Sequence, residues 1–220
     1  MPATRATGLE IIVGVSGGSG AALARRFVQI AAASRGLSRL HLVVSDAALR
    51  VARTELDGGI DTAKAFVGAL ELPGDLARRL TLHDNADVGA SIASGSYPAA
   101  GMAIVPCSGG TLGSIAHGIG RDLLQRAADV CLKERRPLVL ALRESPYSLV
   151  HVENMRLATL AGAVVAPPVP AFYLDDPSPA RFLDAWCART AKRLGLSPPG
   201  DAFVWTGRRT AAGRVEPRRR

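Results

Sequence analysis

The stretch VPCSGGTLGSIAHGIGRDLLQRAADVCLKERRPLVLALRES, residues 105–145, decides the fold class. It begins as an apolar strand pattern, passes through a loop of small residues and enters a long segment with helical periodicity. It then returns to an apolar strand, residues 137–142, which ends at Arg143 and Glu144. Strands of continuous Val, Ile and Leu joined by a helix predict buried, parallel neighbours in a sheet.

The same alternation of strands and helices continues on both sides of this stretch. Strand patterns cover residues 9–15, 39–45, 79–83, 101–106, 137–142 and 163–168. Helical patterns cover residues 19–34, 46–56, 111–134, 148–162 and 179–194, with a weaker region at 57–85. We therefore predict an α/β protein with a three-layer, doubly wound parallel sheet of the Rossmann or flavodoxin-like type. Ligands of such folds bind beyond the carboxyl ends of the strands.

Length and composition indicate one globular domain with a basic end. Of 220 residues, 48% are hydrophobic, and we expect a single domain at 1–198 followed by a flexible basic tail at 199–220. Residues 207–220 hold six of the 27 Lys and Arg but only one of the 19 Asp and Glu, so they carry much of the net charge of +8. No aromatic residues lie between these arginines, so nucleic acid is not favoured as a partner.

Localisation and redox state follow from what the chain lacks in sequence. No apolar run reaches the roughly 18–20 residues of a membrane span, and the first residues, MPATRATGLE, lack the apolar core of a signal peptide. We expect a cytoplasmic protein that does not bind a membrane. The three cysteines, at 107, 131 and 187, are odd in number and far apart, which predicts reduced thiols rather than disulfides or zinc ligands.

The first strand is followed by a loop rich in glycine and serine, GVSGGSGAALARR, residues 14–26. Backbone N–H groups at such a turn, together with the helix dipole, favour an anion. The loop lacks the lysine of a P-loop and does not fit the dinucleotide pattern. It does contain G-x-S-x-G around Ser16, as in the nucleophile elbow of α/β-hydrolases. Only one strand precedes Ser16 and no HGGG-type loop is present, so anion binding is favoured over a hydrolase or a purely structural turn.

A second loop, PCSGGT at residues 106–111, has the same character at another strand end. Two such loops on one sheet edge suit a phosphate and a planar polar ring, which suggests flavin mononucleotide (FMN). Arg126 and Lys133 lie seven residues apart on one helical face, with Asp129 between them. They could form a solvated row of ion pairs or bind a phosphate. Arg143 and Glu144 at a strand end are suited to clamp a phosphate and to exchange a proton with it. The four histidines fit ordinary structural positions.

With these motifs in place, the chain resembles the flavin prenyltransferases of the UbiX type, within the superfamily of flavin-containing cysteine decarboxylase-like proteins. The resemblance spans roughly Leu9–Leu196 and is carried by the stretches GVSGGSGA, VVSDAALRVARTEL, ASGSYPAAGMAIVPCSGGTLGSIAHGI, DLLQRAADVCLKERRPLVLALRESPYSLVHVENMRLATLAGA and PPVPAFY. Two loops depart from the pattern. The first reads GVSGGSGA where members read closer to TGASGA, and CSGGT replaces the common CSMxT, which puts a glycine where a methionine lies beside the flavin.

The resemblance implies a reaction. Dimethylallyl phosphate alkylates reduced FMN at N5 and C6 without a metal, and the product, prenylated FMN, passes to a UbiD-type decarboxylase. It also implies a homo-oligomer, a trimer or dodecamer, with sites at subunit interfaces. Two other functions stay open: a flavin-dependent decarboxylase acting on a cysteine-ended substrate, and a non-catalytic flavin carrier or tail-driven nucleic-acid binder.

Position by position, the resemblance also implies roles for residues. Catalytic roles fall on Ser16, Glu55, Arg126, Lys133, Arg143 and Glu144. FMN contacts fall on Gly14, Val15, Ser16, Ser45, Ser108, Gly109, Gly110, Thr111 and Arg143. Dimethylallyl phosphate contacts fall on Tyr173 and Arg189, and Tyr97 and Tyr173 are candidates for shielding an allylic cation from water.

Overall fold

The computed structural model describes residues 8–172 and 178–200. The predicted ligand Tyr173 and the tail from 201 onward lie outside the described residues, so the predicted boundary at 198 stays a prediction. The strands are β1 (Leu9–Val15), β2 (Leu37–Val44), β3 (Leu80–His83), β4 (Gly101–Cys107), β5 (Leu138–Leu142) and β6 (Val164–Val165). The helices are α1 (Ala21–Ala33), α2 (Asp46–Glu55), α3 (Ala63–Gly68), α4 (Gly74–Ala77), α5 (Gly109–Ala116), α6 (Leu123–Lys133), α7 (Leu149–Leu160) and α8 (Pro179–Arg193), with a 3₁₀ turn η1 (Ser91–Ala93).

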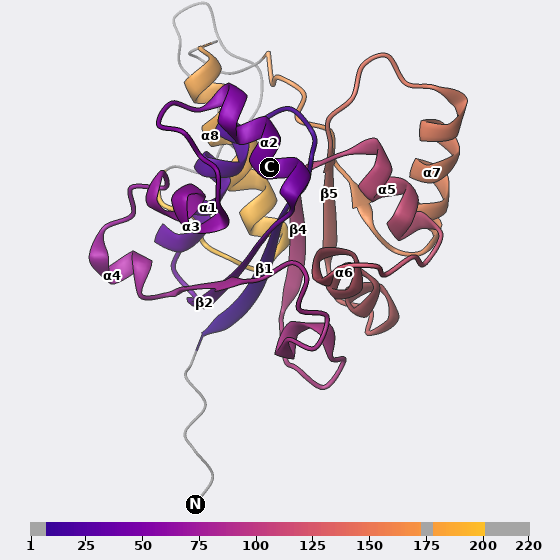
Figure 1. Cartoon of the computed structure of the whole chain (residues 1–220), viewed down its shortest axis with the longest axis horizontal. Coiled ribbons are helices and arrows are strands. Elements are labelled where there is room, and N and C mark those ends of the chain that lie inside the picture. Colours follow the sequence, from indigo (N-terminus) through magenta and orange to yellow (C-terminus); the bar gives the residue numbers. More distant parts are fainter. Residues whose placement is uncertain (1–7, 173–177, 201–220) are drawn as a thin grey trace, which may run out of the picture.

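The six strands form one sheet in the order β3-β2-β1-β4-β5-β6, and every pairing is parallel. The alternate residues of the strands feed two separate apolar cores. One core joins the sheet to α1, α2, α3 and α8, and the other joins it to α5, α6 and α7 (Figure 1). The predicted three-layer, doubly wound α/β fold is confirmed.

The site is positioned by the place where the chain reverses its direction of winding. From β1 the chain first builds β2 and β3 on one side, then crosses to β4 on the other side. β1 and β4 are hydrogen-bonded neighbours, with Gly14 opposite Ile104. Their following loops therefore diverge above the sheet, and this crevice is where ligands of doubly wound folds bind. Both glycine-rich loops predicted from the sequence begin here.

One predicted element was wrong. The pattern at 111–134 predicts a single helix, whereas the structure has two, α5 and α6, joined by residues 117–122. Gly118 adopts a φ of 66°, in the left-handed region that ends helices, and Asp122 caps α6 by accepting from Gln125 N–H at 2.8 Å. The break lets α6 start beside β3, where Leu123 N–H donates to Asn85 O at 2.9 Å.

The cysteines lie in the apolar interior, as predicted. Cys107, Cys131 and Cys187 are all buried and free. Burial raises the pKa of Cys107, at the end of β4, to about 12. This thiol is therefore protonated at neutral pH and is not a nucleophile. In the described part of the chain, no helix is long and apolar enough to cross a membrane.

Candidate functional site

Ser16 joins the two glycine-rich loops at the β1–β4 crevice. Its side chain is only 2% exposed. The hydroxyl donates to Pro106 O at 3.0 Å and accepts from Ser108 N–H at 2.9 Å, while Ser16 N–H also donates to Pro106 O at 3.2 Å. A hydroxyl used in this way has its proton on a carbonyl, and among the described residues it makes no hydrogen bond to a histidine. The hydrolase interpretation of the G-x-S-x-G motif is therefore not supported, and Ser16 fixes the relative position of the loops.

The second loop ends in an open helix N-terminus. Ser108 caps α5 by accepting from Thr111 N–H at 3.2 Å and donates to the Thr111 hydroxyl at 3.0 Å. Within the described residues, the N–H groups of Gly109 and Gly110 have no acceptor. A Cβ at Gly110 would meet nothing within 4 Å. Two free backbone donors at the positive end of a helix, beside open space, can hold an anion or an electron-rich oxygen.

The first loop, by contrast, already holds an anion of the protein itself. Glu55, the last residue of α2, accepts hydrogen bonds from Gly20 N–H at 2.8 Å and Ala21 N–H at 2.7 Å through one oxygen. Partial burial raises the pKa of Glu55, but these N–H groups and a bond from Ser19 outweigh burial, and the nearby positive charge of Arg143 adds to them. The net pKa lies below its usual value, so Glu55 is a carboxylate that neutralises the start of α1.

Three further predicted residues lie around these loops. Arg143 follows β5, and its N–H donates to Cys107 O at 3.0 Å, which holds it beside the second loop. Glu144 comes next, with a carboxylate oxygen accepting from Ser145 N–H at 3.1 Å. Ser45 N–H donates to Val15 O at 3.0 Å, and its hydroxyl caps α2. The structure thus gathers, beside Glu55 at the end of α2, the residues predicted on strand tips and on the loop that follows β4: Gly14, Val15, Ser16, Ser45, Ser108, Gly109, Gly110, Thr111, Arg143 and Glu144.

The glycine at position 109, where UbiX-type sequences commonly have methionine, has a structural explanation. A Cβ built on Gly109 would lie 2.8 Å from Nε2 of His151, so the imidazole occupies the space that a side chain at 109 would need. His151 was read from the sequence as an ordinary helix residue. Only the packing of α7 onto α5 reveals that it borders the loop, because 42 positions separate the two residues along the chain.

Three predicted cations make no hydrogen bond or ion pair with the two loops among the described residues. Arg126 pairs with Asp129 at 2.8 Å on the partly exposed side of α6. Lys133, two turns further on, pairs with Glu134 and lies against Gly95. The segment at Gly95 leads to the start of β4, and the seven residues of that strand place it roughly 20 Å from the strand tips. Arg189 lies on the exposed side of α8, on the other face of the sheet.

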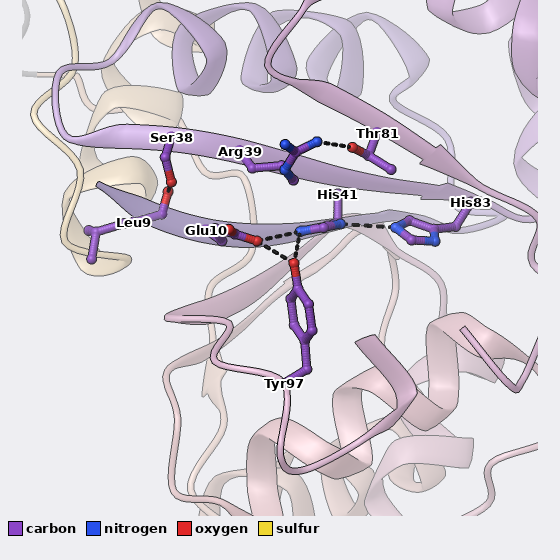
Figure 2. A network of polar contacts seen from close by, with 8 residues as sticks. All are labelled: Leu9, Glu10, Ser38, Arg39, His41, Thr81, His83 and Tyr97. Carbon is purple, nitrogen blue, oxygen red and sulfur yellow. Dashed lines mark hydrogen bonds and ion pairs between the residues drawn. The ribbon is translucent and has the colours of Figure 1, made fainter. Parts of the chain in front are cut away.

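Tyr97 belongs to a different cluster from the one predicted. Its hydroxyl donates to Glu10 near the start of β1 and lies 3.0 Å from Nε2 of His41, far from the strand tips. His41 is 2% exposed, with Nε2 at 3.0 Å from Glu10 and Nδ1 at 2.9 Å from Nε2 of His83. Figure 2 shows this network crossing three neighbouring strands. The sequence placed His41 in a strand correctly but gave no signal for the cluster.

Comparison with known proteins agrees with this site. The family model named Flavoprotein matches residues 2–182. The flavin prenyltransferase UbiX of Deinococcus radiodurans is 44% identical over 192 residues, covering 87% of this chain and 91% of the relative. That of Salmonella typhimurium is 41% identical over 204 residues, covering 90% and 98%.

The chain belongs to the UbiX flavin prenyltransferase family.

Solved UbiX structures share the whole described fold. AnUbiX (PadA1), crystallised with FMN and dimethylallyl pyrophosphate, superposes with a TM-score of 0.77 at 37% identity, over 91% of this chain and 98% of that chain. A dodecameric FMN-dependent UbiX-like decarboxylase of Escherichia coli O157:H7 gives 0.77 at 35% identity, over 90% and 100%. The cysteine decarboxylase TvaF, at 16% identity and a TM-score of 0.54, shares the fold alone. The fold alone does not distinguish this chain from such a protein, but identities of 44% and 41% place it with UbiX.

Proposed function

We propose that this protein is a flavin prenyltransferase that joins the dimethylallyl group of dimethylallyl phosphate to N5 and C6 of reduced FMN. The observation that carries the proposal is the pair of strand-tip loops locked together by Ser16, in a chain whose curated relatives are UbiX flavin prenyltransferases. FMN is a substrate in this reaction, and its reduced ring supplies the nucleophilic N5 and C6. The product, prenylated FMN, would serve a UbiD-type decarboxylase.

The residues at the crevice fit a flavin. Gly109 and Gly110 offer unpaired backbone donors, and the side-chain-free face at Gly110 leaves room for a flat ring or a phosphate. Ser16 and Ser45 fix the backbone of the three strand ends around that space. These groups bind and orient the ligand, and because they belong to rigid strand ends and helix starts they hold it without reorganisation.

The leaving phosphate needs positive charge and a proton donor. Arg143 lies beside the second loop and can bind phosphate oxygens with two parallel N–H groups. Negative charge grows on the phosphate as the allylic C–O bond breaks, so this guanidinium would stabilise the transition state. Glu144 stands next to it and would exchange a proton with a phosphate oxygen. We propose the monophosphate as donor because the family resemblance implies it, although the similar structure AnUbiX was crystallised with the pyrophosphate.

The remaining cations would come from a neighbouring subunit. Lys133 and Arg189 lie away from the strand tips of their own subunit. The structurally similar UbiX-like decarboxylase of Escherichia coli O157:H7 is a dodecamer. We infer that assembly brings Arg126, Lys133 and Arg189 of one subunit to the phosphate of another. Co-assembly of two inactive variants, Lys133→Ala and Arg143→Ala, should then restore part of the activity, since some mixed sites carry neither change. If the mixture stays inactive although mixed oligomers form, the shared site is wrong.

The proposed reaction is tested by direct product detection. Protein, reduced FMN and dimethylallyl phosphate are mixed without oxygen, and the flavin is examined by mass spectrometry for one added prenyl group. Parallel samples contain the diphosphate instead, or lack protein. We expect the adduct with the monophosphate and protein only. Flavin that binds but is never alkylated by either donor would instead make the protein a flavin carrier.

A further inference from the structure

The imidazole of His151 borders the open N-terminus of α5. A Cβ on Gly109 would lie 2.8 Å from Nε2 and 3.1 Å from Cδ2 of this ring. Real Cβ atoms do not approach other heavy atoms to under 3.0 Å, so residue 109 must be glycine for the ring to stay where it is. Nε2 therefore lies beside residue 109 at the start of α5, where the two free N–H groups of the second loop also lie.

The local hydrogen bonds fix which nitrogen of His151 carries the proton. Ser148 N–H donates to Nδ1 at 3.2 Å, and the Ser148 hydroxyl accepts from His151 N–H at 3.3 Å. This reciprocal pair is the capping box that starts α7. A neutral imidazole that accepts at Nδ1 must carry its proton on Nε2. The nitrogen that faces the loop is thus a donor, and Tyr147 packs its ring edge against the same imidazole.

A second contact between α5 and α7 shows what a purely structural role looks like. One turn further along each helix, Asn154 approaches Gly113 in the same manner, with Nδ2 3.1 Å from a Cβ built there. Asn154 has a protein partner, since its Oδ1 lies 3.2 Å from Nε2 of His117. Among residues 8–172 and 178–200, the Nε2 proton of His151 has no acceptor. Asn154 thus bridges α7 to the end of α5 through His117, whereas His151 makes no hydrogen bond to α5 among these residues.

We propose that His151 is a flavin-binding residue whose Nε2–H donates a hydrogen bond to an oxygen acceptor of the flavin held on the second loop, an inference that rests on the proposed function. The acceptor is a carbonyl oxygen of the ring or a phosphate oxygen of the ribityl chain, since both accept from a neutral imidazole. Gly109 is glycine so that this ring can reach the ligand.

Three variants of the full-length protein separate donation from packing. His151→Leu removes the Nε2 donor and the Nδ1 acceptor. His151→Gln keeps both functions, because its oxygen can accept from Ser148 N–H, as glutamine does at this capping-box position, while its amide donates. His117→Leu is the matched control, since it removes a histidine that bridges the same two helices away from the loop. Each variant is titrated with FMN and with riboflavin, with flavin fluorescence as the readout.

We expect His151→Leu to weaken FMN binding about fivefold to tenfold, the usual effect of one lost hydrogen bond. His151→Gln and His117→Leu should bind as the unmodified protein does. An equal loss for riboflavin assigns the donor to the flavin ring, and a loss confined to FMN assigns it to the phosphate. Gly109→Ala, which displaces the ring without altering it, should also weaken binding and serves if His151→Leu does not fold.

Two results would overturn the inference. One is unchanged affinity of His151→Leu for both flavins, and the other is a loss in His151→Gln as large as in His151→Leu, which would indicate packing alone. Failure of the unmodified protein to bind FMN is a different result, because it rejects the proposed function itself.

Discussion

Replacing Ser16 by alanine tests whether one hydroxyl holds the two loops together. The substitution removes an acceptor from Ser108 N–H and a donor from Pro106 O at a position only 2% exposed. Pro106 O keeps the Ser16 N–H bond at 3.2 Å, but Ser108 N–H is left without its partner. An unsatisfied buried donor plus one lost hydrogen bond amounts to about 2–3 kcal/mol. For a chain of this size, each kcal/mol lowers Tm by about 2–4 °C, so we expect a decrease of about 4–12 °C.

The measurement is thermal unfolding at one fixed protein concentration, because assembly contributes to Tm. Ser45→Ala is the matched control: it also removes a serine hydroxyl, but loses only the cap to Ala48 N–H, which contributes about 1 kcal/mol. Ser45→Ala should lower Tm less than Ser16→Ala does. Ser16→Ala should also weaken FMN binding, because the second loop is no longer held by the hydroxyl. If Ser16→Ala unfolds at the same temperature as Ser45→Ala, the bridging role of Ser16 is wrong.

Three more changes test other parts of the structure. Gly17→Ala would place a Cβ 2.6 Å from Cβ of Ala47 and should lower the free energy of unfolding by about 1–3 kcal/mol in denaturant titrations, with recovery in the double variant Gly17→Ala/Ala47→Gly. Glu55→Ala should lower the free energy of unfolding by about 1 kcal/mol, and Glu55→Gln by less, because the amide oxygen still accepts from Gly20 N–H and Ala21 N–H. Equal losses of stability in the two variants would mean that these hydrogen bonds do not stabilise the fold. Burial lowers the pKa of His41 below 6.5. On acidification the unfolded chain therefore binds a proton at this histidine before the folded protein does. Stability should be full above pH 6.5 and fall on acidification by up to about 1.4 kcal/mol per pH unit, and His41→Asn should flatten that slope in unfolding curves measured across pH.

The sheet and both loops were predictable because their signals are local. Continuous apolar runs mark β1, β2, β4 and β5, and each glycine-rich loop directly follows one of them. Strand tips share one edge in a parallel sheet, so residues on those tips were placed together correctly.

What the sequence did not reveal depends on contacts across the chain or on weak local signals. Glu55 reaches α1 over 35 positions, and His151 reaches Gly109 over 42, with no periodicity to mark either contact. The break at Gly118 was missed because an isolated glycine inside a helical pattern is tolerated. α3 and α4 were indistinct because they are one or two turns long and bury only Phe66.

The carboxylate of Glu55 at the start of α1 makes the two glycine-rich loops unequal as binding sites for the two phosphates of the proposed reaction. It occupies the Gly20 and Ala21 donors of the first loop, whereas the Gly109 and Gly110 donors at the start of α5 remain open within the described residues. A phosphate held only by guanidinium and ammonium groups would be bound less rigidly, because these long side chains can change rotamer. In the proposed reaction, backbone donors would hold the flavin phosphate firmly while the ring is alkylated, and the inorganic phosphate bound by side chains would leave more readily.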